Sequence, residues 1–147
     1  MCRDRRLFEL DAPSPRHVSA VDPSTLVLAA VVSSSDDAII TQSLDGTIET
    51  WNRGAERMFG YSALEAVGRP ASILVPPERL EEEDTAIERI RRGDPVGHFE
   101  TERISKSGLR VPVSVTISPV LTPTGEIYGI SRIARDLTER LALERNA

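Results

Sequence analysis

Residues 38–60 read AIITQSLDGTIETWNRGAERMFG, and this stretch decides the fold. Two strand-like runs flank Asp45-Gly46, a pair that favours a tight turn between antiparallel strands. Asn52 can cap a two-turn helix directly after the second strand, and Gly60 can end that helix in the left-handed conformation. The stretch therefore predicts a β-hairpin that leads at once into a short helix.

Three further helical segments are predicted downstream of this hairpin. Ser62 and Glu65 match a capping box, in which each side chain satisfies a free amide, and Gly68 is expected to close the helix. A short helical piece over 70–74 follows. The longest helix is predicted over 80–92, because acidic residues fill its first turn and arginines fill its last, as the helix dipole favours.

Three strand-like segments complete the core, over 97–104, 109–120 and 126–136. The middle one alternates, with Val111, Val113, Val115 and Ile117 on one side and Ser114, Thr116 and Ser118 on the other. One face of the sheet is therefore expected to meet water. Short turns between the segments require an antiparallel meander. Helices placed as one block between two groups of strands indicate an α+β fold.

The segments outside this core are predicted to be a tail and two helices. Residues 1–21 lack sustained periodicity and are expected to form an irregular N-terminal extension. A flanking helix is predicted over 22–34, since Asp22-Pro23 is a typical helix start. The core then spans 35–136, and 137–147 begin a C-terminal helix. The flanking helix carries an apolar stripe of Leu26, Val27, Ala30 and Val31.

Composition and charge limit the classes of function. A chain of 147 residues, 39% hydrophobic and 28% charged, is typical of one globular domain. Its net charge of −5 gives no attraction to nucleic acid, so no such partner is expected. Cys2 is the only cysteine, which excludes an intramolecular disulfide. The apolar run 26–32 is too short to cross a bilayer, so we expect no membrane contact by this segment and a cytoplasmic location.

Several short segments together form a specific pattern: Ser35-Asp36-Asp37-Ala38-Ile39-Ile40, Leu44-Asp45-Gly46, Trp51-Asn52-Arg53-Gly54-Ala55-Glu56, Phe59-Gly60-Tyr61, Phe99-Glu100-Thr101-Glu102-Arg103, Lys106-Ser107-Gly108, Ile117-Ser118-Pro119 and Ala134-Arg135-Asp136-Leu137-Thr138-Glu139-Arg140. In these segments the chain resembles the PAS domains of bacterial sensory proteins, over residues 24–140. The resemblance implies a five-stranded antiparallel sheet with short helices packed on one face and flanking helices at both ends. It also implies a module found upstream of histidine kinases or diguanylate cyclases, commonly dimeric through the flanking helices.

The sequence offers few groups for catalysis or metal binding. His17 and His98 are the only histidines, one in the tail and one at a strand start, so the common triads lack a base. Neither a P-loop nor a dinucleotide-binding motif is present. The acidic run 81–84 is explained by the helix dipole and by solvation. No catalytic residue and no metal ligand are therefore predicted.

Two acids on one predicted strand face, Glu100 and Glu102, could bind a cation or a basic ligand group. Pairing across strands with Arg103, Arg110 or Lys106 is the simpler account.

The resemblance also bears on cofactors. It places the haem-binding histidine of some PAS domains at Glu83, and the flavin-binding cysteine of others within 68–72, where this chain has no cysteine. Neither haem nor covalent flavin is therefore predicted. An unknown, non-covalently bound small ligand stays open. The candidate pocket residues are Met58, Phe59, Ile73, Leu74, Ile87 and Ile90, which would equally fill a core.

The sequence thus favours a non-catalytic sensory module that dimerises and relays a conformational change to an effector such as a histidine kinase. The alternative is a small-molecule sensor with a ligand in the PAS pocket. The stripe on the flanking helix is the predicted dimer interface. Asp136 and Thr138 are the candidate relay residues, because a carboxylate at this junction can cap the new helix and pair with a nearby arginine.

Overall fold

The computed structural model describes residues 23–94 and 96–146, and the chain divides into two units, 1–32 and 33–147. The extension predicted over 1–21 lies outside the described residues. The flanking helix is present as α2, Pro23–Ser34, and none of its residues is buried. Leu28 and Val32 are exposed together with Leu26, Val27 and Val31, so the apolar surface of α2 is wider than the predicted stripe. None of the described helices is long and apolar enough to span a membrane.

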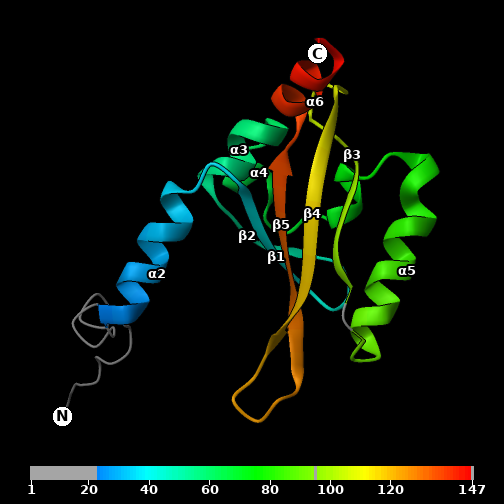
Figure 1. The fold of residues 1–147 in the computed structure, drawn as a ribbon. Helices are drawn as coiled ribbons and strands as arrows, with labels where there is room; N and C mark the ends of the chain where they lie inside the picture. The colour runs from blue at the N-terminus through cyan, green and yellow to red at the C-terminus, as the bar shows by residue number, and fades with distance from the viewer. Residues whose placement is uncertain (1–22, 95, 147) are drawn as a thin grey trace, which may run out of the picture. The chain divides into compact units, whose positions relative to one another are not determined.

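The second unit is built on a five-stranded antiparallel sheet with the order β2-β1-β5-β4-β3 (Figure 1). The strands are β1 (Ala38–Ser43), β2 (Ile48–Trp51), β3 (Gly97–Ile104), β4 (Arg110–Leu121) and β5 (Ile127–Asp136). The predicted hairpin and meander are confirmed. The last strand lies at the centre, between the hairpin and the meander, so any displacement of β5 reaches both halves of the sheet.

A block of helices follows the hairpin, and a final helix follows the sheet. These elements are α3 (Arg53–Phe59), α4 (Ala63–Ala66), the 3-10 helices η2 (Ala71–Leu74) and η3 (Pro77–Arg79), α5 (Leu80–Arg91) and α6 (Thr138–Asn146). The core lies between this block and one face of the sheet, where Phe59 and Ile90 meet Val113 and Ile117. The predicted alternation along β4 is confirmed, because Val111, Val113, Val115 and Ile117 are buried while the intervening Ser114 and Thr116 keep some exposure.

Asn52 joins the first helix of the block to the sheet. Its Oδ1 accepts hydrogen bonds from the amides of Ala55 and Ile39, each at 2.9 Å, and its Nδ2 donates to the carbonyl of Asp37 at 3.0 Å. The predicted cap is thus also a bridge to β1. Gly60 ends the helix with φ of 82°, as predicted.

The capping box of Ser62 and Glu65 is present, but the helix that it begins is shorter than predicted. It ends at Ala66, with Val67 as its C-cap in an extended conformation. Gly68, which we expected to close this helix, instead donates its amide to the carbonyl of Ile48 at 2.8 Å. Its left-handed backbone therefore turns the chain back onto β2.

Gly54 lies where α3 passes closest to the start of β1. A Cβ atom at this position would stand 2.1 Å from the carbonyl oxygen of Asp37. Helix propensity alone would favour alanine by about 1 kcal/mol, whereas forcing an atom into a packed backbone contact costs about 1–3 kcal/mol.

We therefore expect Gly54→Ala to lower the melting temperature by several degrees in a thermal unfolding experiment. Arg53→Ala is the matched control, because Arg53 is exposed on the same helix and its truncation should leave the melting temperature almost unchanged. A melting temperature above that of the wild type for Gly54→Ala would show that α3 does not approach β1 this closely.

Candidate functional site

Glu83 is the only buried carboxylate among residues 23–94 and 96–146, with 6% of its surface exposed. It lies on α5 together with Ala86 and Ile90, at the three- and four-residue spacing that places all three on the inward face. The helix thus turns a charged group into the core at a position where an apolar residue would be usual. A charge in this place requires a partner, because removal from water disfavours its ionised form.

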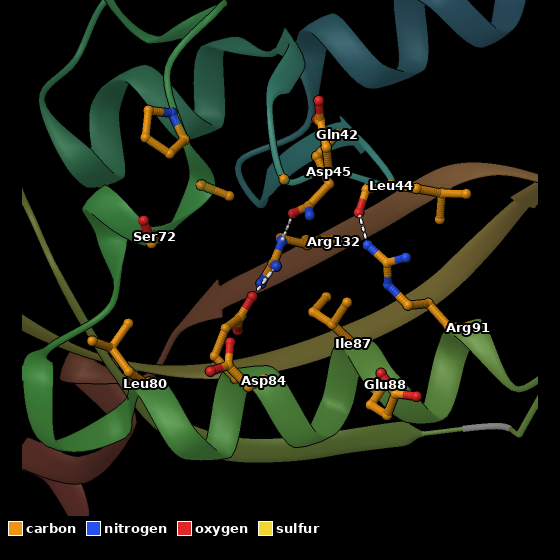
Figure 2. Close-up of a pocket in the computed structure, with 14 residues that line it drawn as sticks. Gln42, Leu44, Asp45, Ser72, Leu80, Asp84, Ile87, Glu88, Arg91 and Arg132 are labelled. Carbon is orange, nitrogen blue, oxygen red and sulfur yellow. Dashed lines mark hydrogen bonds and ion pairs between the residues drawn. The ribbon is translucent and has the colours of Figure 1, made fainter.

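Two buried arginines supply that partner, one from the central strand β5 and one from the edge strand β3. Arg132 of β5 donates to both carboxylate oxygens of Glu83, through Nη1 at 3.0 Å to Oε1 and through Nη2 to Oε2. Arg103 of β3 donates through Nη2 to Oε1 at 3.2 Å. The Nε of Arg132 also donates to Oε1 of Gln42 in β1, at 2.5 Å. One carboxylate therefore joins α5 to two strands of the sheet, and through Arg132 and Gln42 to a third. Figure 2 shows the contacts of Arg132 with Gln42 and with α5.

The arginine charges of the cluster oppose the effect of burial on the pKa of Glu83. Burial raises the pKa of the Glu83 carboxyl, but the hydrogen bonds and charge of Arg132, with the charge of Arg103, outweigh it and leave the pKa below its ordinary value. Burial also lowers the pKa of Arg103, against the raising influence of Glu83. Arginine remains protonated in proteins at neutral pH. The cluster of Glu83, Arg103 and Arg132 therefore carries a net charge of +1 within the core.

A pocket of about 470 Å³ opens beside α5 and reaches this cluster. Gln42, Glu83 and Arg132 form part of its lining and are themselves buried. The guanidinium of Arg91, near the end of α5, donates to the carbonyl of Leu44 (Figure 2). We call this space the α5 pocket; its other lining residues are Asp45, Gly46, Pro70, Ala71, Ser72, Leu80, Asp84, Ile87 and Glu88.

A second, much smaller cavity of about 20 Å³ lies deeper in the core. Both arginines line it, together with the apolar side chains of Ile40, Phe59, Ala71, Leu74, Val115 and Ala134. This volume is enough for about one water molecule, so the core beside the arginines is nearly filled.

The six predicted pocket residues are distributed over several places. Ile87 lines the α5 pocket, whereas Phe59 and Leu74 line the small cavity. Met58 lies along a groove beside α6, which Leu141 and Pro112 also line. Ile90 is fully buried, and Ile73 packs against the core from its edge.

The residues at the cluster do not fit a haem. Glu83, at the position where the resemblance places a haem ligand, has both oxygens bonded to arginines. The neighbouring cavity of about 20 Å³ is far smaller than a macrocycle. Among residues 23–94 and 96–146, no group of three or more His, Cys, Asp or Glu side chains is arranged to hold a metal ion.

The interpretation of the acidic run 81–84 as a solvated helix start was wrong for Glu83, which is buried in the cluster. Glu82 remains partly exposed in the first turn and accepts a hydrogen bond from the hydroxyl of buried Thr101 at 2.7 Å. Sequence analysis also missed Gln42 and Arg132. A usable signal existed, because Arg132 lies midway between Ile130 and Ala134 on the inward side of the alternating β5.

The predicted pairing of Glu100 and Glu102 is confirmed for only one of the three expected partners. Glu102 pairs with Arg110 at 3.3 Å, while Arg103 turns inward to Glu83 and Lys106 pairs with Glu65. Glu100 instead pairs at 2.8 Å with Arg140 of α6, a contact that ties the final helix to β3. His98 is exposed at the start of β3.

The junction between β5 and α6 is anchored to the sheet. Oδ1 of Asp136 accepts from the amide of Thr138 at 2.8 Å, so the predicted cap is present. Within the described part of the chain, Asp136 makes no ion pair with an arginine, contrary to the second role that we expected. Leu137 is buried, and its amide donates to the carbonyl of Pro112 at 2.8 Å. The direction of α6 is thus set by β4 as well as by β5.

Comparisons with known proteins agree with this architecture. A family model described as "PAS domain" matches residues 36–139. The sensor protein FixL of Bradyrhizobium diazoefficiens is 32% identical over 117 residues, which are 76% of this chain and 23% of that protein. Two-component system protein A of Emericella nidulans is 34% identical over 113 residues, 74% of this chain and 16% of that protein. The chain thus spans less than a quarter of the length of these relatives.

A solved structure shows the same fold. The crystal structure of the PAS domain of a protein from Colwellia psychrerythraea matches with a TM-score of 0.70 and 25% identity. The match covers 79% of this chain and 98% of that one.

The cluster predicts how stability responds to loss of the buried carboxylate. Glu83→Gln keeps the shape of the side chain but leaves two buried arginines without a countercharge, a change that typically costs about 3–5 kcal/mol. We expect a melting temperature lower by roughly 10 °C for a domain of this size. Asp84→Asn is the matched control, because it removes an exposed acid from the next position of α5 and should have little effect.

The difference in stability between the wild type and Glu83→Gln should depend on pH in a direction that the lowered pKa of Glu83 defines. Since the pKa of Glu83 is lowered by folding, the unfolded chain takes up a proton before the folded chain does as the pH falls below about 4.3. The wild type then loses the contribution of Glu83, so its advantage over Glu83→Gln should narrow in acid. A difference that is constant from pH 7 to acid would contradict an ionised, paired Glu83.

Proposed function

The chain belongs to the PAS domain family, and from this premise we propose that it is a sensory module that relays the state of its α5 pocket to an effector through α6. The names of the relatives, a sensor protein and a two-component system protein, support this function. We infer an effector such as a histidine kinase. A chain whose only cysteine is Cys2 also fits the cytoplasmic location that this proposal includes.

The observation that carries the proposal is the path from the α5 pocket to α6. Glu83 in the lining of the pocket is bonded to Arg132, and Arg132 lies on β5 only four residues before Asp136. A second connection runs through β3, where Arg103 contacts Glu83 and Glu100 contacts Arg140 of α6. Any event that alters the pairing of Glu83 therefore acts on β5, which leads into the final helix, and on β3, which is ion-paired to it.

The α5 pocket favours ligand sensing as the input to this path. Its volume of about 470 Å³ falls in the usual range for small-molecule sites, and its floor consists of buried polar groups. A relay between subunits without a ligand would not need an opening that reaches the cluster. The two functions are compatible, since a ligand-dependent change can be passed on within a dimer.

The proposal includes a homodimer in which α2 supplies the interface. Leu26 is 53% exposed and Val27 is 61% exposed, a degree of apolar exposure that association would reduce. Ala30 and Val31 complete the predicted stripe on the same helix.

We expect the double substitution Leu26→Glu with Val27→Glu to convert the dimer to a monomer, as measured by light scattering. Thr25→Glu is the matched control, since it adds charge at an exposed polar position of the same helix and should leave the dimer intact. Equal masses for the wild type and both variants would contradict an interface on α2.

Asp136 should affect signalling more than stability. Asp136→Ala removes the cap on Thr138, at a cost of about 1 kcal/mol, and frees the start of α6 from β5. In a protein that carries the native effector or a surrogate histidine kinase, signal-dependent activity should fall sharply while the melting temperature changes by only a few degrees.

Asp136→Asn is the control, because asparagine also caps helices well and should retain regulation. Intact regulation in Asp136→Ala, or unfolding of that variant, would contradict the relay role of this residue.

A further inference from the structure

The buried cluster has more capacity to bind anions than Glu83 uses. Each guanidinium has five N–H donors. Arg132 directs one to Gln42 and two to Glu83, and its other two have no acceptor among residues 23–94 and 96–146. Two arginines also share one buried carboxylate, so the core retains a positive charge. The cluster therefore favours an additional anionic group, or an exchange of one carboxylate for another.

The α5 pocket gives a ligand access to this cluster. Glu83 and Arg132 both line it, and Figure 2 shows the guanidinium of Arg132 directed across it toward α5. Leu80 and Ile87 contribute apolar surface beside the same space. A ligand here would have its charged group at the floor and its carbon atoms against α5.

We propose that the α5 pocket binds a small monocarboxylate, whose carboxylate replaces that of Glu83 on Arg132. This inference rests on the proposed sensory function and names the class of its ligand. The side chain of Glu83 beyond its Cβ atom is chemically an acetate group, so a short carboxylate can reproduce the paired hydrogen bonds to the guanidinium. Glu83 keeps Arg103 as its partner after the exchange, and the added carboxylate neutralises the net charge of +1 on the cluster, so no buried charge is left unpaired.

The rim of the pocket limits what the other end of the ligand can be. Asp45, Asp84 and Glu88 lie in the lining, against Arg91, whose guanidinium is bonded to the carbonyl of Leu44. A second carboxylate on the ligand would meet these acids and be repelled. The pocket therefore selects a ligand that is neutral or cationic at its outer end, and disfavours dicarboxylates.

The binding event has a direct structural consequence. When the ligand displaces the carboxylate of Glu83 from Arg132, α5 loses its bidentate hydrogen bonds to β5. The strand is then held by the ligand instead of by the helix, so the ligand changes the coupling between α5 and the strand that leads into α6.

Chemical rescue tests the exchange. Glu83→Ala removes the internal carboxylate and leaves room for an added one, so propionate should raise the melting temperature of this variant by several degrees, and by more than it raises that of the wild type. Propionamide and sodium chloride at equal concentration should not raise the melting temperature of Glu83→Ala, because neither supplies a carboxylate that can accept two hydrogen bonds from a guanidinium. Ile48→Ala is the matched control, because it creates a cavity at a buried residue that lines neither the α5 pocket nor the small cavity beside the arginines, and it should show no response to propionate.

A titration of the wild-type chain, followed by amide chemical shifts, keeps the inference testable if Glu83→Ala does not fold. Propionate should shift the amides of Gln42 and Ile87 in a saturable way, and succinate should bind more weakly. In Glu83→Gln the affinity for propionate should rise about tenfold, because the competing internal carboxylate is gone. Absence of saturable shifts in the wild type, or an equal response to propionamide, would overturn the assignment.

The outcomes also separate this inference from the proposed function. Carboxylate binding without any effect on an attached effector would support the ligand class and overturn the sensory role. An effector that responds to another ligand, in a chain that propionate does not bind, would overturn the ligand class and leave the sensory role intact.

Discussion

A carboxylate buried between a helix and a sheet must be paired, and this requirement governs how α5 lies on the core. Removing each ion from water costs several kcal/mol, which only close and complete hydrogen bonding recovers. Glu83 meets the requirement with Arg132 and Arg103, so α5 has little freedom to slide along the sheet without losing both partners. Buried ion pairs seldom add much net stability, but they penalise alternative packings strongly. The cluster therefore contributes more to selecting one packing of α5 on the sheet than to the net stability of the fold.

Local signals were sufficient to predict most of the fold. The turn at Asp45-Gly46, the cap at Asn52 and the alternation along β4 each depend on residues that are neighbours in the sequence, and the structure confirms each of them. The site is different, because the partners of Glu83 lie 20 and 49 residues away. A glutamate in an acidic run at a helix start already has a sufficient local explanation. Only the inward position of Arg132 between two apolar residues conflicts with its sequence context, and that conflict indicates where the polar core lies.

Two anchors hold the chain at the same end of the sheet. Asn52 bonds to both α3 and β1, and Leu137, directly after β5, is buried and bonded to Pro112. The central strand β5 contacts the α5 pocket through Arg132 and continues at this end into the final helix. In the function that we propose, a single strand therefore connects the α5 pocket to α6, with the rest of the sheet as its support.

The hydrogen bond between Arg91 and Leu44 bears on the rates at which a molecule could enter and leave the α5 pocket. It joins the end of α5 to the turn after β1, at exposed groups that water can replace at little cost in free energy. Contacts of this kind affect how quickly a bound molecule enters and escapes more than how tightly it is held. For the ligand that we propose, the floor of the α5 pocket would set the occupancy at equilibrium, while the rim would set the residence time, and with it how long a signalling state outlasts the stimulus.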